Sequence, residues 1–489
     1  MLHRRFVPIA AAALLVALPA TPPAEATNGV HSANMTHVAN VPYRFGSDLE
    51  LTTLTADVGN GPEARDFVVA GSEGGGMRLI DVTDPTQPVV AQTFTCAAVQ
   101  GDIQIFTRDG RTYAGYGIDN SGANLGTKCF QDGLALPAQA SRAGEAPYGT
   151  FIIDITNPYV TSGPDRVRVV GWARLASGSH NTTVDPSGRW IYSSNQDLFP
   201  RLGVSSPRFQ MEIFDLADLT NPTIATIVPL DTGVGTHDVT FSADGNRAYV
   251  AAITHTVIFD TTNKANPTQL GVILDPSVSI HHQADPVDLG GRRFVVVSDE
   301  LAGVLVGSRV CGGGGLHVYD VTGPLELAPV KVGYYGIPRV EPGGDTRCSS
   351  HVFRVYPEQN LMTIGWYGAG TRVLDVSGLV GVSAGVSPAV GSVGAGIREV
   401  GSFFFPSGST QSETWAAKVH HFDADGSAYI FANDYDRGLD VFRFDASAPP
   451  APAVGTWLTG STARAAKAQP LVGTTAYRPS CAVPRSARV

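Results

Sequence analysis

The sequence predicts an all-β protein that folds as a seven-bladed β-propeller of four-stranded antiparallel blades. First, a short apolar strand that ends in aspartate and runs into a turn-prone segment occurs seven times, at spacings of 45 to 73 residues along the 489-residue chain. Second, 55 glycines and 33 prolines supply the many turns that short strands need. Third, no long apolar run with helical period is present. Self-similarity of this kind is typical of repeat architectures, among which four strands in about 40–45 residues make one propeller blade.

The seven copies share β-branched and aromatic residues, then aspartate, then threonine, serine, asparagine or proline. Their aspartates are Asp81, Asp154, Asp215, Asp260, Asp320, Asp375 and Asp445. A carboxylate at the end of a strand accepts hydrogen bonds from the N–H groups of the turn that follows. We expect these residues to hold turns on the outer half of each blade; as metal ligands they would lie too far apart.

The copy at residues 236–276 shows the blade pattern most completely. Residues 236–241 read as a first strand, 242–245 as a tight hairpin turn, and 247–253, 256–260 and 269–274 as the remaining strands. The predicted organisation is a signal peptide at 1–26, an N-terminal arm at 27–46, the propeller at 47–460 and a tail at 461–489. The arm either leads into the first blade or completes the last one.

The first 26 residues have the pattern of a secretory signal peptide of bacterial type. Arg4 and Arg5 precede an apolar stretch at residues 8–18, and Ala24-Glu25-Ala26 matches a cleavage site. No segment approaches the ~18 unbroken apolar residues of a membrane span. We therefore expect a secreted, extracellular protein.

The five cysteines suit an oxidising compartment. Cys96 and Cys129 flank one insertion and Cys311 and Cys348 another, so these two pairings are the most economical. Cys481 could instead pair with one of the four, and the thiols could also be free. The net charge of −10 and a pI near 5.6 argue against nucleic acid as a partner.

The repeated strand-Asp-[VIL]-[TS]-x-P pattern resembles the LVIVD repeat of secreted bacterial proteins. The resemblance extends over roughly residues 45 to 460 of this chain. It implies the propeller fold and export, and it says little about activity.

Four histidines occupy the same repeat position, at the start of a first strand: His180, His237, His282 and His351. First strands line the channel of a propeller, so these imidazoles should converge near its axis. Neutral imidazoles suit transition metals, and we predict a Cu, Fe or Zn site held by the four histidines. The alternative is that each histidine only fixes the loop between two blades.

Two further features of the sequence adjoin that position. In the second blade Asp102 replaces the histidine, and in the seventh His420 and His421 lie two or three residues further along, as a fifth ligand or a general base. In the pairs His281-His282 and His420-His421, strand alternation should send one ring into the channel and the other away from it.

The ends of the second strands should form a polar rim on the same face. They read Asp119-Asn120, Asn195-Gln196-Asp197, His255, Asp299-Glu300, Trp366-Tyr367 and Asn433-Asp434-Tyr435-Asp436. Asp102, Asp197, Asp299 and Glu300 would orient the metal ligands or contact substrate, with Asp102 and Glu300 also candidates for catalysis. An ordinary solvated surface is the alternative for the rim.

Three functions fit these observations. The first is a metal-dependent oxidoreductase that acts on a small molecule at the channel mouth. The second is a non-catalytic propeller that binds an extracellular protein or glycan. The third is a calcium-dependent, lactonase-like hydrolase that uses rim carboxylates with Asn195 or Asn433. The sequence favours the metal-binding propeller.

Overall fold

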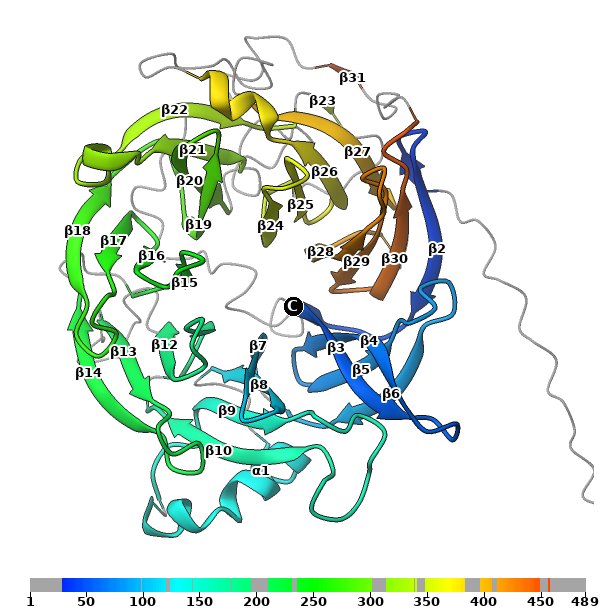
Figure 1. The fold of residues 1–489 in the computed structure, drawn as a ribbon, viewed down its shortest axis with the longest axis vertical. Helices are drawn as coiled ribbons and strands as arrows, with labels where there is room; N and C mark the ends of the chain where they lie inside the picture. Colours follow the sequence, from blue (N-terminus) through cyan, green and yellow to red (C-terminus); the bar gives the residue numbers. More distant parts are fainter. Residues whose placement is uncertain are drawn as a thin grey trace, which may run out of the picture.

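Seven four-stranded antiparallel sheets surround a central axis, which confirms the predicted all-β propeller (Figure 1). The computed structural model describes residues 29–448 and 456–457, apart from 98, 120–123, 143, 177, 195–209, 231–234, 301–313, 338, 341–347, 383–395 and 407–410. The predicted signal peptide and most of the tail are therefore outside the described residues.

In the first four blades the strands follow one another from the axis outward. Blade one contains β3 (Gly46–Asp57), β4 (Pro62–Ser72), β5 (Met77–Asp81) and β6 (Val89–Phe94). Blade two contains β7 (Gln100–Arg108), β8 (Arg111–Ile118), β9 (Gly149–Asp154) and β10 (Arg168–Arg174). Blade three contains β11 (Thr182–Val184), β12 (Trp190–Ser194), β13 (Gln210–Asp215) and β14 (Thr223–Pro229). Blade four contains β15 (Asp238–Phe241), β16 (Arg247–Ala251), β17 (Thr256–Asp260) and β18 (Thr268–Ile273).

The last three blades repeat this order; of the N-terminal strands, β1 adds a fifth strand to blade six and β2 completes blade seven. Blade five contains β19 (His281–Leu289), β20 (Arg292–Asp299), β21 (Leu316–Asp320) and β22 (Val330–Tyr335). Blade six contains β24 (Phe353–Tyr356), β25 (Leu361–Gly365), β26 (Thr371–Asp375) and β27 (Arg398–Phe404), with β1 (Val30–His31) beside β27. Blade seven contains β28 (Thr414–Phe422), β29 (Ala428–Asp434), β30 (Gly438–Phe444) and, as its outermost strand, β2 (Met35–Val41).

The ring closes by pairing the two ends of the described chain. β2 lies antiparallel to β30, with Met35 opposite Phe444 and Val41 opposite Leu439. Of the two roles expected for the N-terminal arm, it therefore completes the last blade. Joining the ends in one sheet ties blade seven to the start of the chain and covers the edge of β30.

The repeated aspartates hold turns, as predicted. In each of the seven copies one carboxylate oxygen accepts a hydrogen bond from the N–H two residues further on, as Asp260 does from Thr262 at 2.9 Å. Six of the seven aspartates also pair with an arginine, as Asp154 does with Arg111. The turn chemistry therefore belongs to the frame of the propeller.

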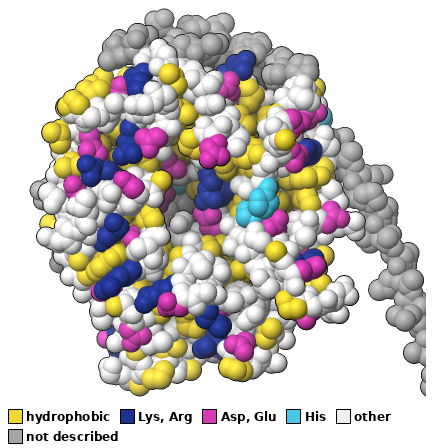
Figure 2. Space-filling view, viewed as in Figure 1, with side chains coloured by type: hydrophobic (Ala, Val, Ile, Leu, Met, Phe, Trp, Pro, Cys, Tyr) yellow, Lys and Arg dark blue, Asp and Glu magenta, His cyan; other side chains and the backbone are white. Residues whose placement is uncertain are grey.

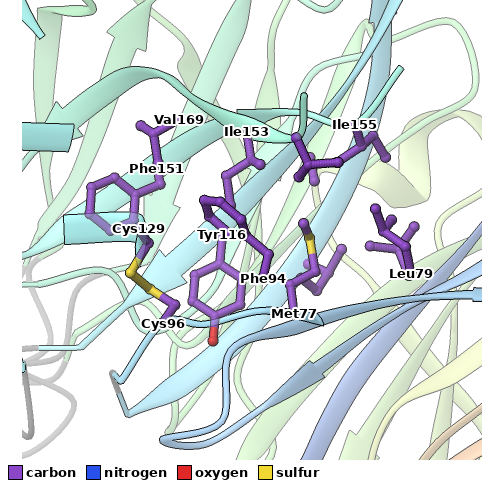
Figure 3. Close-up of a cluster of buried hydrophobic side chains, with 14 of the residues drawn as sticks. Met77, Leu79, Phe94, Cys96, Tyr116, Cys129, Phe151, Ile153, Ile155 and Val169 are labelled. Carbon is purple, nitrogen blue, oxygen red and sulfur yellow. A yellow bond between two sulfur atoms is a disulfide. The ribbon is translucent and has the colours of Figure 1, made fainter. Parts of the chain in front are cut away.

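The core lies between neighbouring blades, because side chains of one strand alternate between its two faces. Phe151 and Ile153 of β9 pack toward blade one, whereas Ile152 packs toward blade three. Figure 3 shows the first of these clusters, with the disulfide between Cys96 and Cys129 at its edge.

That disulfide confirms one predicted pairing. It ties the end of β6 to α1 (Lys128–Leu134), which is followed by a 3-10 turn at Pro137–Arg142. Cys348 is also in a disulfide. Because Cys311 and Cys481 lie outside the described residues, the pairing of Cys311 with Cys348 stays a prediction.

Besides α1 and the turn that follows it, the described residues form further short elements outside the blades. They are 3-10 turns at Gly323–Glu326 and Ser377–Gly381, and a pair of two-residue strands, β23 (Arg339–Val340) and β31 (Thr456–Trp457). In the described part of the chain, no helix is long and apolar enough to cross a membrane.

Candidate metal centre

The four predicted histidines occupy one register position on the inner strands of four successive blades. The N–H groups of His180, His237 and His351 donate to carbonyls near the end of the second strand of their own blades, at 2.6, 2.7 and 3.0 Å. His282 reaches this position through a β-bulge between His281 and Gln283 of β19. The backbone ladder therefore delivers four imidazoles to one level of the axis.

The four rings form a continuous row. The distances between ring centroids are 4.6 Å from His180 to His237, 4.3 Å from His237 to His282 and 4.1 Å from His282 to His351. All four residues are at most 2% exposed. The predicted convergence at the axis is therefore present in the structure.

Glu300 brings a carboxylate to the middle of this row. One ligand atom each from His237, His282 and Glu300 lies within 4.8 Å of the other two. The Nε2 atom of His282 is 4.0 Å from Oε2 of Glu300. Since bonds of about 2.0–2.2 Å to zinc place two ligand atoms at most about 4.4 Å apart, small side-chain movements would close this group around one ion.

The other oxygen of Glu300 is held by Tyr367. The phenol O–H of Tyr367 donates to Oε1 of Glu300 at 2.7 Å, and both side chains are fully buried. Tyr367 has a φ of 36°, a left-handed backbone conformation that is uncommon for a bulky residue. A residue held in this way beside the axis is a positioning group for the carboxylate.

The two outer histidines differ in what they offer an ion. Nδ1 of His351 donates to the carbonyl of Trp415 at 2.9 Å, so its Nε2 carries the lone pair, as in many metal-binding histidines. His180 lies 3.4 Å from a carboxylate oxygen of Asp119 through Nδ1 and 3.4 Å from the amide of Gln100 through Nε2. His351 is therefore better suited than His180 to act as a fourth ligand, and His180 lies at the end of the row.

Burial keeps the inner imidazoles neutral. Desolvation, assisted by the neighbouring histidines, holds the pKa of His237 and that of His282 well below the usual range. Burial also lowers the pKa of His351 to about 3. Neutral imidazole is the form that binds a metal ion, so His237, His282 and His351 suit a metal ion at neutral pH.

One nitrogen of the row that could face an ion lacks a partner. Nε2 of His351 makes no hydrogen bond within the described part of the chain. Leaving a buried polar atom unpaired costs about 1–3 kcal/mol, and coordination would remove this cost. The donor set and this nitrogen fit a transition-metal ion.

A layer of carboxylates lies further along the channel. Burial raises the pKa of Asp238 to about 8 and also raises the pKa of Asp285. Lys418 donates to Glu50 at 2.9 Å and to Asp48 at 3.1 Å, so this layer contains a buried ion-pair network.

Asp102 belongs to the carboxylate layer, which corrects its expected place among the histidines. Its Oδ2 accepts from the N–H of Thr182 at 2.8 Å, two residues beyond His180. A register shift in β7 between Gln100 and Ile103 moves this blade by one position. Gln100 therefore contacts His180 in the place predicted for Asp102.

The other residues predicted for the rim either hold the backbone or lie outside the described residues. Asp299 accepts from the N–H groups of Ser279 and Ile280 at 2.8 and 3.1 Å, which anchors the start of blade five. Asn433 donates to the carbonyls of Asp48 and Gly71, so its amide has a structural role. Asn195 and Asp197 lie outside the described residues.

His420 and His421 do not join the central row, which corrects their expected role there. They lie near the other end of β28 beside Asp66, five and six residues beyond Trp415, whose carbonyl contacts His351. At ~3.3 Å per residue these are separations of roughly 16 and 20 Å along the strand. A bulge between Val419 and Phe422 also brings both rings to one carboxylate, against the expected alternation. His281 does alternate as predicted: its Nδ1 meets the hydroxyl of Thr256 at 2.9 Å.

Comparisons with known proteins identify no family for this chain, so the class of protein is defined by its fold and its site. No model of a known protein family matches the chain, and no curated protein is detectably similar to it. The structure shows a seven-bladed β-propeller with a buried histidine and glutamate group that could hold a metal ion. The LVIVD resemblance stays a prediction.

Proposed function

We propose that this chain is a secreted metal-binding β-propeller and that its ion is bound by His237, His282 and Glu300, with His351 beside them. The observation that carries the proposal is that one ligand atom each from the buried His237, His282 and Glu300 lies within 4.8 Å of the other two. Two imidazoles and one carboxylate are donors suited to Fe²⁺ or Zn²⁺, and imidazole also suits Cu²⁺.

The reaction class we propose is oxidation of a small molecule. When His351 does not coordinate the ion, the three ligands His237, His282 and Glu300 leave a position free for substrate, as in catalytic sites. An iron or copper ion would supply one-electron chemistry there. Glu300 accepts the Tyr367 proton in a hydrogen bond of 2.7 Å, and this pair can hold or pass a proton beside the ion.

Aromatic residues form one wall of the site. His351 lies 4.8 Å from the rings of both Tyr367 and Trp415, and Trp415 stacks on Tyr435 at 5.6 Å. These rings are almost fully buried, so they keep water from that side of the histidines. A dry site strengthens the electrostatic interactions within it.

Burial also supports a second function. Because the ligands are at most 2% exposed, the ion would also suit a stabilising role in a non-catalytic propeller that binds an extracellular protein or glycan. Metal content alone does not separate the two functions, whereas redox cycling of the bound ion does.

The test begins with protein produced without a histidine tag. Apo-protein is reloaded separately with Fe²⁺, Cu²⁺ and Zn²⁺, and metal content is measured for wild type, for His237→Gln/His282→Gln and for the control His255→Gln. His255 is a buried histidine outside the group. We expect the double variant to lose one ion per chain and the control to keep it. Equal metal content in all three proteins would overturn the site.

The reaction class needs a separate readout. Wild-type protein loaded with iron or copper is reduced with ascorbate and reoxidised in air, and the spectrum of the ion is followed. Reversible cycling supports the oxidoreductase. An ion that does not cycle, or a centre that accepts only Zn²⁺, contradicts that function and favours the stabilising role.

A further inference from the structure

A second group of metal-ligating side chains lies at the seam where the last blade meets the first. It consists of Asp66 of β4 in blade one and His420 and His421 of β28 in blade seven. One ligand atom from each lies within 4.8 Å of the other two. None of these residues belongs to the central row, so this group stands apart from the proposed function.

The distances in this group match a metal site. Oδ1 of Asp66 is 3.3 Å from Nε2 of His420, and Oδ2 is 3.2 Å from Nε2 of His421. These separations exceed the ~2.7–2.9 Å of a good charge-assisted hydrogen bond. Each separation, measured to a different oxygen of Asp66, is close to the spacing of about 3.3–3.6 Å between neighbouring ligands of a tetrahedral ion with bonds of about 2.0–2.2 Å. One ligand atom from each of the three residues lies within 4.8 Å of the other two.

A neighbouring hydroxyl orients the carboxylate. Thr53 of β3 donates to Oδ1 of Asp66 at 2.7 Å, and the same hydroxyl lies 3.0 Å from Nε2 of His420. Although burial opposes it, this hydrogen bond lowers the pKa of Asp66. A carboxylate that is ionised and held by an outer partner is typical of metal sites.

Both imidazoles reach the carboxylate because of local backbone geometry. The bulge between Val419 and Phe422 brings consecutive rings to the same side, with centroids 3.9 Å apart. Burial, then the neighbouring His421, lower the pKa of His420, which favours its neutral form. Arg354, whose charge also lowers the pKa of His420, is engaged with Glu50 at 2.6 Å.

The group is open to solvent. The side chain of His421 is 65% exposed and that of Asp66 is 28% exposed. Figure 2 shows histidine side chains beside the central hollow of the viewed face. An ion could therefore enter without any movement of the blades.

We propose that Asp66, His420 and His421 form a second site, which binds a divalent transition ion such as Zn²⁺ and links blade seven to blade one. The ligands come from the two blades at which the ring closes. An ion between them would add a cross-link to the closure that β2 provides. Imidazole and carboxylate donors suit Zn²⁺, and the remaining position would be filled by water.

Calorimetric titration of chelator-treated, full-length protein with Zn²⁺ tests this proposal. Wild type is compared with His420→Gln/His421→Gln, with Asp66→Asn and with the control His31→Gln, an exposed histidine outside both groups. We expect the first two variants to bind one fewer Zn²⁺ per chain than wild type, and the control to match wild type. Because the readout is a difference, it holds whether or not the central row binds an ion.

Folding of the variants is checked by circular dichroism, and His421→Gln, at the most exposed ligand, is the mildest change. We expect Zn²⁺ to raise the melting temperature of wild type more than that of this variant. Zn²⁺ stoichiometry that is unchanged in all variants would overturn the proposal, and it would assign the three side chains to a surface ion pair.

Discussion

Replacing Glu300 by glutamine isolates the charge of the one carboxylate in the central row. The amide oxygen of the variant keeps the acceptor for Tyr367, which donates at 2.7 Å in the wild type. The shape and the burial of the side chain are also preserved. What is lost is an anionic ligand 4.0 Å from Nε2 of His282.

The magnitude follows from what this carboxylate does. Loss of even an orienting partner of a metal ligand lowers affinity about 10–100-fold, so loss of a ligand charge should reach at least the upper part of that range. A factor of 100 corresponds to about 2.7 kcal/mol. We therefore expect E300Q to bind Zn²⁺ about 100-fold more weakly, with an unchanged melting temperature of the apo-protein.

The assay is competition with a chromophoric chelator at neutral pH. Each protein also carries H420Q/H421Q, so that only the central row is titrated. E413Q is the matched control, because Glu413 is a buried glutamate outside the group. Equal Zn²⁺ affinity of E300Q and its parent, or an equal loss in E413Q, would refute the role of Glu300.

Three further predictions concern the frame around the site. K418M should lower the free energy of unfolding in urea by about 3–5 kcal/mol, since it leaves the buried carboxylates of Asp48 and Glu50 without the cation that they share. Adding D48N to K418M should recover part of that loss. Burial raises the pKa of Asp285 above its ordinary value of 3.8, so the native state retains the proton and wild-type stability falls as pH rises above that value. D285N should therefore gain stability over wild type as pH increases, by about 1.4 kcal/mol for each unit of pKa shift, and a pH-independent difference in urea unfolding would contradict this. D260A removes the hydrogen bond that holds its turn at 2.9 Å and should cost about 1 kcal/mol, with no change in metal binding.

The sequence could predict the fold because the signal for it is repeated. Each copy combines a strand, an aspartate and a turn, and the aspartates make the predicted turn contacts in all seven. In blade four the predicted strand at 256–260 matches β17, and the other three differ by one or two residues at their ends. The same register predicted that four distant histidines would converge.

Bulges explain most of what the sequence could not predict. A single extra residue moves side chains to the other face of a strand. Such shifts in β7 and β28 put Gln100 in the place expected for Asp102 and turn both His420 and His421 toward Asp66. Gly101, with a φ of 71°, lies in the β7 bulge, and a glycine within a strand is a signal for a bulge. The segment from Val419 to Phe422 contains no glycine or proline to mark the second bulge.

The role of Glu300 depends on geometry beyond the end of a strand. The sequence placed Asp299 and Glu300 together on the rim, and the backbone after β20 sends only the second to the row. Tyr367, which holds Glu300, is expected on the same rim, but no signal in the sequence pairs the two side chains. Export, and the signal peptide on which that prediction depends, fall on residues outside those described.

Metal content of the H420Q/H421Q protein, produced without a tag and reloaded with Fe²⁺, Cu²⁺ or Zn²⁺, tests the central claim most directly. This protein retains the central row as its one buried group of metal ligands among the described residues. We predict about one ion per chain, lost when H237Q/H282Q are added. Protein that stays essentially metal-free with every ion, below ~0.2 per chain, would contradict the claim that the row at the propeller axis is a metal centre.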